Sequence, residues 1–310
     1  MKYTILLKQH IGAPCIAVVS KGDTVKKGSL LAEPTGLGAV IHSPFSGKIS
    51  DITETAILID ADEMQPQDFF PLAVASEKEM LKASGIVGMG GAGFPTSVKL
   101  DIDLKGGYIL VNAAECEPLL QHNTKQLETN AELTLRGLKA AMQLCNAKKG
   151  VFAIKAKHEK VISILDSLLN SEPDISYHLL PDLYPMGEER AVVREVLGKL
   201  LTPTELPSAA GAVVINVETV LRIAEALEFS RPCITKNITV AGKLKGGTHS
   251  RVFMDVPIGT TVGELIERAG GIDGDYGEII MGGPFTGNPV ALDTPITKTT
   301  GGIIVTEPFK

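Results

Sequence analysis

The sequence predicts an α/β protein of three modules, because the local pattern of residues changes twice along its 310 positions. Short strand-like runs broken by glycine, proline and aspartate fill residues 1–72. Strand and helix patterns alternate over residues 73–232, and short strands around a single helix fill residues 233–310. Alternating strands and helices indicate a largely parallel sheet with helices on its faces. We therefore expect an all-β module, an α/β module and a small α+β module.

The N-terminal module (residues 1–72) contains two turn phrases, GDTVKKG from Gly22 and SPFSGKI from Ser43. They resemble turns of the lipoyl/biotinyl-like sandwich, where such turns flank a lysine that carries the prosthetic group. The lysine-bearing hairpin is missing here, so we expect a structural relative without a modified lysine. Lys48 is accordingly not expected to be a modification site.

In the central module (residues 73–232), the sequence predicts a short helix over 77–83, a glycine-rich loop, and a buried strand from Tyr108. Apolar residues at helical spacing from Leu127 to Cys145 predict a long amphipathic helix. The later part predicts strands over 150–156 and 175–180 and helices over 158–170 and 188–200.

In the C-terminal module (residues 233–310), the sequence predicts one helix over 261–271, capped by Thr260 or Thr261. The strands around it are predicted over 238–242, 251–257, 278–283 and 301–308. This order of elements resembles that of the ubiquitin-like β-grasp fold. We expect a docking or packing role for it, without chemistry of its own.

Composition excludes several classes of function. The net charge of -6 and the absence of cationic clusters argue against nucleic-acid binding. We find no apolar run long enough to span a bilayer and no signal peptide, so we expect a cytoplasmic protein. The four cysteines form no CxxC pair, which predicts reduced thiols and no zinc or iron–sulfur site. No metal is expected.

The stretch GIVGMGGAGFPTSVKL, from Gly85 to Leu100, is the first candidate site. Glycine is costly to order, so five glycines in nine residues call for a reason in the backbone. Amide groups of such a loop, ending at a helix N-terminus, would favour a phosphate. A tight structural turn is the alternative explanation.

Three further motifs carry polar side chains. VNAAECEP follows the strand from Tyr108, at the end where open parallel sheets bind ligands, and offers Asn112, Glu115 and Glu117. YPMGEE places Glu188 and Glu189 at a helix start, and INVET places Asn216 and Thr219 at another. Taken singly, these residues could be solvated loop residues or helix caps.

Together the motifs GMGGAGFPTSVK, VNAAECEP, YPMGEE and INVET resemble the flavin-binding subunit of respiratory complex I. They look still more like the RnfC-type electron-transfer subunits, whose relatives include cobalamin reductase. The chain is most similar to the electron-transfer protein associated with proline reductase, of the PrdC type. LKQHIGAPC and IHSPFSGKI resemble the RnfC-type barrel-sandwich hybrid, and MGGPFTGNPV its ubiquitin-like SLBB β-grasp domain. The resemblance implies a central Rossmann-like domain that binds FMN and NADH.

The resemblance also implies the residues of the site. In this picture the glycine loop holds flavin and dinucleotide, Phe94 faces the adenine, and Lys99 supplies positive charge. No catalytic side chain is implied, because hydride passes from the nicotinamide to the flavin while Glu117 and Glu189 position the rings. The full cofactor-binding set is Gly88, Gly90, Gly91, Gly93, Phe94, Lys99, Asn112, Glu115, Glu117, Tyr184, Gly187, Glu188, Glu189, Asn216 and Thr219.

Three departures qualify the resemblance. Ala114 replaces an acidic residue of the complex I pattern, and no second aromatic residue follows Phe94 before Tyr108. The CxxCxxCxxxCP segment of RnfC-type chains is missing, so this chain offers no cluster ligands although relatives carry iron–sulfur clusters. We expect that the chain is truncated after its third module, or that it passes electrons to a separate partner.

The function predicted is an NADH-oxidising flavoprotein module that passes electrons to a partner reductase or carrier, with proline reductase as the leading candidate. The alternatives are a non-catalytic scaffold of an RnfC-like complex, a cobalamin reductase-like protein, and a sugar- or nucleotide-phosphate-binding protein. Any membrane association would be peripheral, through partner subunits. Cys116 is predicted to be a packing residue, because no second thiol lies nearby in the sequence.

Overall fold

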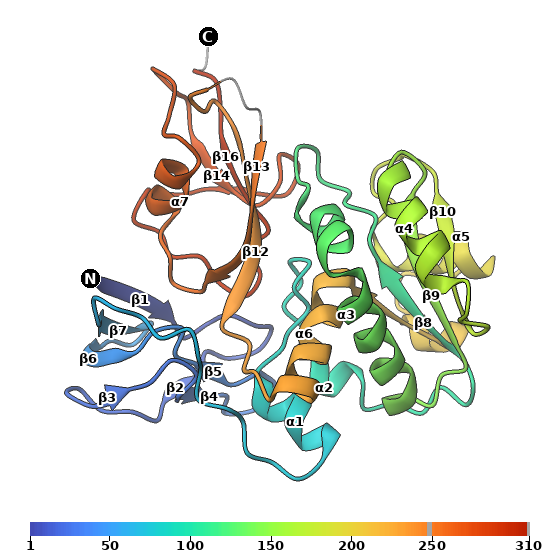
Figure 1. The fold of residues 1–310 in the computed structure, drawn as a ribbon, viewed down its shortest axis with the longest axis horizontal. Coiled ribbons are helices and arrows are strands. Elements are labelled where there is room, and N and C mark those ends of the chain that lie inside the picture. The colour runs from blue at the N-terminus through green and yellow to red at the C-terminus, as the bar shows by residue number, and fades with distance from the viewer. Residues whose placement is uncertain (247–249, 309–310) are drawn as a thin grey trace.

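The computed structural model describes residues 1–246 and 250–308 (Figure 1). Separate groups of buried apolar side chains lie within the three predicted modules, and two of these groups share the central sheet. The predicted boundaries at residues 72 and 232 stay predictions. The parts of the third module at 247–249 and 309–310 lie outside the described residues.

The N-terminal module consists of two small antiparallel sheets with one shared core. Ile49 and Ile57 contribute to this core from one sheet, and Leu31 and Ile41 from the other. Lys48 is exposed in the middle of a ladder, paired with Thr24. The strands are β1 (Lys2–Leu6), β2 (Ile16–Ala17), β3 (Thr24–Val25), β4 (Leu30–Glu33), β5 (Ile41–His42), β6 (Gly47–Ile52) and β7 (Ala56–Ala61).

The central module contains the predicted parallel sheet, with the strand order β10-β9-β8-β11. Its strands are β8 (Tyr108–Asn112), β9 (Lys149–Lys155), β10 (Ile175–Leu180) and β11 (Ala212–Asn216). Its longer helices are α1 (Glu77–Ser84), α3 (His122–Leu144), α4 (Glu159–Leu169), α5 (Glu189–Leu197) and α6 (Val217–Phe229). Strand β11 is not among the predicted strands, because INVET was interpreted only as the head of a helix.

Helices cover both faces of this sheet, as an apolar central strand requires. Ile109 and Val111 of β8 pack into the core that contains α3, α4 and α6. Leu110, which points to the opposite face, packs into a second core with Val192 and Val193 of α5. In Figure 1, α3 and α6 lie side by side between the sheet and the C-terminal module.

The strand order places a topological switch point between β8 and β11. From β8 the chain moves through β9 to β10 on one side, and then returns to add β11 on the other side of β8. The connection after β8 leads through α3 to β9, whereas β11 continues through α6 into the C-terminal module. Open α/β sheets bind their ligands at such a point.

The C-terminal module is a mixed sheet with the order β13-β12-β16-β14-β15, against which α7 (Val262–Arg268) packs. Thr261 is the N-cap of α7 and forms a capping box with Glu264, which decides between the two predicted caps. The assignment to the SLBB family stays a prediction. The strands are β12 (Thr235–Gly242), β13 (Ser250–Pro257), β14 (Ile279–Met281), β15 (Asn288–Pro289) and β16 (Gly302–Val305).

Two helices differ from the prediction in length. α3 begins at His122, earlier than expected, and has a kink at Asn130 with φ of -133°. The helix predicted after the glycine loop is only the single turn α2 (Thr96–Lys99), so its dipole contributes little to anion binding. A 3₁₀ turn, η1 (Pro207–Ala210), precedes β11. None of the helices in the described part of the chain is long and apolar enough to cross a membrane.

Candidate functional site

The candidate site lies at the carboxyl edge of the parallel sheet, at the switch point. Asn112 ends β8 and Asn216 ends β11, and the two residues are direct register partners. The asparagines of two distant motifs are therefore neighbours. Asn216 also caps α6, because its Oδ1 accepts hydrogen bonds from the amides of Glu218 at 2.9 Å and Thr219 at 3.4 Å.

The glycine loop closes on itself beside Asn216. The amide of Gly88 donates to the carbonyl of Phe94 at 2.8 Å, and the amide of Gly93 donates back to the carbonyl of Gly88 at 3.0 Å. Gly91 has a φ of +116°, which favours glycine. A Cβ on Gly90 would lie 3.0 Å from Asn216 Nδ2, so a side chain there would crowd the asparagine.

Three consecutive amides of this loop have no hydrogen-bond acceptor in the part of the chain that the structure describes. Gly90, Gly91 and Ala92 are exposed, and their N–H groups donate to no acceptor in residues 1–246 or 250–308. Asn216 Nδ2 is likewise a donor without an acceptor in that part of the chain. These four N–H donors, named here the donor arc, are suited to an anionic group such as a phosphate.

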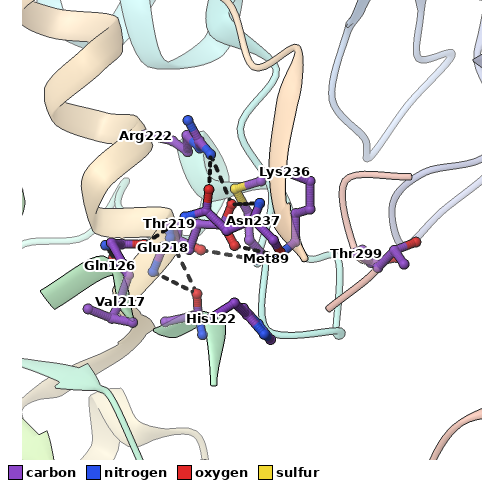
Figure 2. A network of polar contacts seen from close by, with 12 residues as sticks. Met89, His122, Gln126, Val217, Glu218, Thr219, Arg222, Lys236, Asn237 and Thr299 are labelled. Atoms are coloured by element: carbon purple, nitrogen blue, oxygen red, sulfur yellow. Dashed lines mark hydrogen bonds and ion pairs between the residues drawn. The ribbon is translucent and has the colours of Figure 1, made fainter. Parts of the chain in front are cut away.

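Thr219 anchors the loop from behind. Its Oγ1 accepts a hydrogen bond from the amide of Met89 at 3.0 Å and donates to the carbonyl of Val87 at 3.3 Å. Figure 2 shows Thr219 and Met89 beside a buried ion network of Glu218, Lys236 and Arg222. Thr219 is thus a buried positioning residue, and its hydroxyl does not face open solvent.

The loop before α5 forms a further wall of the site. Asn112 Nδ2 donates to the carbonyl of Gly187 at 2.8 Å, and the amide of Gly187 donates to the sulfur of Cys116. A Cβ on Gly187 would lie 2.8 Å from that sulfur, so the close approach requires glycine. Burial raises the pKa of the Cys116 thiol, which fits the predicted packing role.

The two glutamates at the start of α5 have different tasks. Glu188 is the N-cap of α5 and accepts hydrogen bonds from Ala191 and Arg190, as its capping interpretation predicted. Partial burial opposes its charged form, yet these hydrogen bonds leave the pKa below its usual value. Glu189 instead forms an ion pair with Lys99, which joins α5 to α2 at the end of the glycine loop.

Glu115 points away from the donor arc, into the protein. Its Oε2 accepts hydrogen bonds from the amide of Thr124 at 2.9 Å and from its hydroxyl at 3.3 Å, and its Oε1 lies 3.6 Å from His122 Nδ1. Burial raises its pKa to about 7, although the bonds from Thr124 act in the opposite direction. The structure therefore places this carboxylate against the first turn of α3.

Glu117 contacts the C-terminal module. Its Oε2 accepts a hydrogen bond from the amide of Phe285 at 2.9 Å, and its Oε1 accepts one from the hydroxyl of Thr286. Tyr184 packs edge-to-face on Phe285 with ring centroids 4.7 Å apart. Phe94, expected to face an adenine, is partly buried next to Pro95.

Comparison with known proteins follows the same division of the chain. Residues 1–65 match the RnfC barrel sandwich hybrid domain, and residues 81–225 match the Nuo51 FMN-binding domain. One subunit of the Na(+)-translocating ferredoxin:NAD(+) oxidoreductase complex of Acetobacterium woodii is 32% identical, over 97% of this chain and 72% of that protein. The chain belongs to the RnfC family. Among other relatives of this RnfC-family chain, cobalamin reductase PduS of Salmonella typhimurium is 41% identical, over 74% of this chain.

The RnfC-family chain spans about half the length of the cobalamin reductases it matches, 49% in each case. Among solved structures, an NAD+-reducing [NiFe]-hydrogenase in the H2-reduced state has a similar fold, with a TM-score of 0.62 and 21% identity. That likeness covers 74% of this chain and 46% of the hydrogenase chain. At this identity it supports the fold alone.

Sequence reasoning missed the residues that the C-terminal module brings to this RnfC-family site. Phe285 and Thr286 lie in the motif GGPFTG, which contributed to the sequence analysis only as a point of family resemblance. The C-terminal module itself was expected to have no role in the chemistry of the site. Lys155, buried at the carboxyl end of β9 and paired with Asp182, was also missed. In residues 1–246 and 250–308 no three His, Cys, Asp or Glu side chains gather to hold a metal ion.

Proposed function

We propose that this chain is an FMN-carrying electron-transfer module that accepts hydride from NADH and passes electrons to a partner reductase or carrier. The donor arc at the switch point carries the proposal. Its exposed backbone amides and the neighbouring Asn216 amide have no acceptor among the described residues, and such donors are suited to the phosphate of a flavin nucleotide.

The residues present fit such a group. Gly90 and Gly91 let the backbone approach a ligand closely, because neither carries a side chain above the arc. Lys99 is partly exposed, with a side chain 25% accessible, and adds positive charge at the end of the same loop. Asn216 and Lys99 would hold the phosphate end, and Asn112 would lie nearer the ring.

FMN supplies a ring that takes up hydride and releases electrons singly. The protein contributes orientation and the exclusion of water. The ion pair of Lys99 and Glu189 joins α2 to α5, and Asn112 fixes the loop before α5 through Gly187. A general base is not needed for hydride transfer, so we assign these side chains to positioning.

The relatives support electron transfer as the class of reaction. Their names describe a cobalamin reductase and subunits of ferredoxin:NAD(+) oxidoreductase complexes. We accordingly propose a protein partner as the electron acceptor, with NADH as the donor. The assignment to proline reductase stays a prediction from the resemblance.

Loading the protein with FMN tests the donor arc. In the free protein, an alanine at position 91 lets the loop relax away from the positive φ. FMN binding must then restore this strained φ, at a cost on the order of 1 kcal/mol, so Gly91→Ala should weaken FMN binding about tenfold. Gly22→Ala is the matched control, since both glycines have positive φ and no atom within 4 Å of an added Cβ. The affinities are measured by fluorescence titration of the flavin. Equal affinities of the two variants would contradict the site.

Anaerobic addition of NADH to the loaded protein tests the reaction. Bleaching of the visible flavin absorption should be rapid in the native protein and slower in Glu189→Gln, which loses the carboxylate that pairs with Lys99. Flavin that stays oxidised would show that its donor is not NADH.

A scaffold without cofactor is the second candidate, and one observation favours it. Asn112, Glu117 and Lys99 all have partners within the chain, so these polar groups are satisfied without a ligand. A scaffold would retain no FMN in the titration above, whereas the proposed electron-transfer module would.

A further inference from the structure

The loop Gly282–Gly287 of the C-terminal module reaches the central module at Glu117. It leaves β14, turns back through a hydrogen bond from the amide of Gly287 to the carbonyl of Gly283 at 2.9 Å, and enters β15. At the tip of this turn lie Phe285 and Thr286. Glu117 is 168 residues away from Phe285 in sequence, yet their hydrogen bond is 2.9 Å long.

Both oxygens of the Glu117 carboxylate accept hydrogen bonds from this loop. One oxygen accepts the amide of Phe285 and the other accepts the hydroxyl of Thr286. A Cβ on Gly283 would lie 2.1 Å from Oε2 of Glu117, so only glycine permits the contact. Because two adjacent residues of the loop donate to its two oxygens, Glu117 is suited to holding the loop in place.

The loop places an aromatic ring beside a second one. Phe285 is 60% exposed and Tyr184 is 49% exposed, although their rings are in edge-to-face contact at an interplanar angle of 67°. Exposed aromatic rings that touch each other leave faces free for a planar partner. Tyr184 also lines a surface cavity of about 420 Å³ together with Glu188 and Arg190, so it borders open space.

These rings adjoin the site already described. Tyr184 lies three positions before Gly187, whose carbonyl accepts the amide of Asn112, and Glu117 lies five positions after Asn112. Tyr184 is thus connected to the carboxyl edge of the sheet by a short segment of chain, and Phe285 by its hydrogen bond to Glu117. Flat heterocyclic bases stack on such rings, and the gain in binding free energy is large enough to determine affinity.

We propose that Phe285 is a dinucleotide-contacting residue that the C-terminal module contributes to the site, and that Glu117 is the positioning residue that holds it there. The ring of Phe285 stacks on a planar base of the nicotinamide dinucleotide, next to Tyr184. This inference rests on the proposed function, because it assumes that the site takes a dinucleotide. It gives the C-terminal module a direct part in recognition.

The absence of tryptophan from the chain allows a direct test. Phe285→Trp introduces one fluorophore at the proposed contact, in protein loaded with FMN. Phe229→Trp is the matched control, because Phe229 is similarly exposed, at 53%. It is the last residue of α6, twelve positions after Val217, the first residue of that helix, which adjoins the site. NAD+ is added to each variant while tryptophan emission is followed, and calorimetry measures NAD+ binding independently.

Saturable quenching in Phe285→Trp, with the same midpoint as the calorimetric binding curve and none in Phe229→Trp, supports the contact. Binding of NAD+ by calorimetry without quenching in Phe285→Trp overturns it, while the proposed function stands. If calorimetry shows no binding of NAD+ to the native protein, both the inference and the NADH part of the proposed function fail.

The positioning role of Glu117 is tested through its partner hydroxyl. Thr286→Val, in the Phe285→Trp background, should weaken NAD+ binding about threefold to tenfold, because it removes one of the two bonds that hold the loop. Thr286→Ser keeps a hydroxyl and should restore the affinity. FMN affinity should be unchanged in both variants. Equal NAD+ affinities of the valine and serine variants would overturn the positioning role.

Discussion

Three carboxylates around one sheet edge have three different partners. Glu115 is buried against Thr124, Glu117 holds Phe285 of another module, and Glu189 pairs with Lys99. Glu115 and Glu117 follow β8, and Glu189 begins α5. That the three carboxylates serve one cofactor site stays a prediction. The direction of each side chain was not predictable, because Glu115 has a left-handed φ of +43° and Glu117 meets residues that are distant in sequence.

Glu115 should make the stability of the protein fall as pH rises. Its pKa is about 7 in the folded protein against an ordinary value of 4.5, so the folded state binds an extra proton between these two values. The free energy of unfolding, relative to Glu115→Gln, should therefore be constant below about pH 4.5, decline by about 3 kcal/mol up to about pH 7, and level off above.

Chemical denaturation at a series of pH values measures this difference. Burial lowers the pKa of His122, whose Nδ1 lies 3.6 Å from Glu115 Oε1, so the comparison is repeated in a His122→Gln background that lacks the imidazole. A difference that stays constant with pH, or rises, would contradict the burial of a protonated Glu115.

At the scale of elements, α6 joins the site to the C-terminal module. Its first turn carries Asn216 as the cap and Thr219 as the anchor of the glycine loop, and Glu218 between them belongs to the buried ion network (Figure 2). Glu218 accepts hydrogen bonds from Arg222 of α6 and from the amide of Asn237 in β12. Helical periodicity predicts a helix near INVET, but no local pattern indicates that Glu218 faces another module.

Removing one member of this network should be costly. Lys236→Met leaves the fully buried Glu218 without its closest cation, and breaking a buried ion pair costs about 3–5 kcal/mol. Lys243→Met, just after the same strand, removes a pair with the exposed Glu307 and should cost less than about 1 kcal/mol. Urea denaturation measures both variants, and similar losses in the two would count against the network as a link between modules.

At the scale of the whole molecule, Lys298 connects all three modules. It is buried in the C-terminal module, and its ammonium donates to the carbonyls of Val40 and Gly85, each at 2.6 Å. Its backbone amide donates to Gln9 Oε1. Within residues 1–246 and 250–308 it has no carboxylate partner, and burial lowers its pKa. The sequence predicted the order of the three modules, but it offered no sign of this contact, whose members lie up to 289 residues apart.

Lys298→Met should loosen the modules at two distant points. Loss of the ammonium leaves two carbonyl groups without a donor, at about 1–3 kcal/mol for each buried group. Hydrogen exchange should become faster around both Val40 and Gly85, whereas Lys82→Met, an exposed change near Gly85, should leave both regions as they are. Faster exchange confined to the neighbourhood of residue 298 would contradict the three-way contact.

The glycine loop has one further consequence for how the protein matures. The carbonyl of Gly93 accepts the amide of Ile11, and a Cβ on Gly93 would lie 3.1 Å from Thr299 Cγ2. The loop is therefore shaped by residues of the N-terminal and the C-terminal module. The ribosome must have synthesised the chain past Thr299 before this surface exists. Under the proposed function, flavin insertion then follows synthesis of the C-terminal module and does not occur while only the central module has left the ribosome.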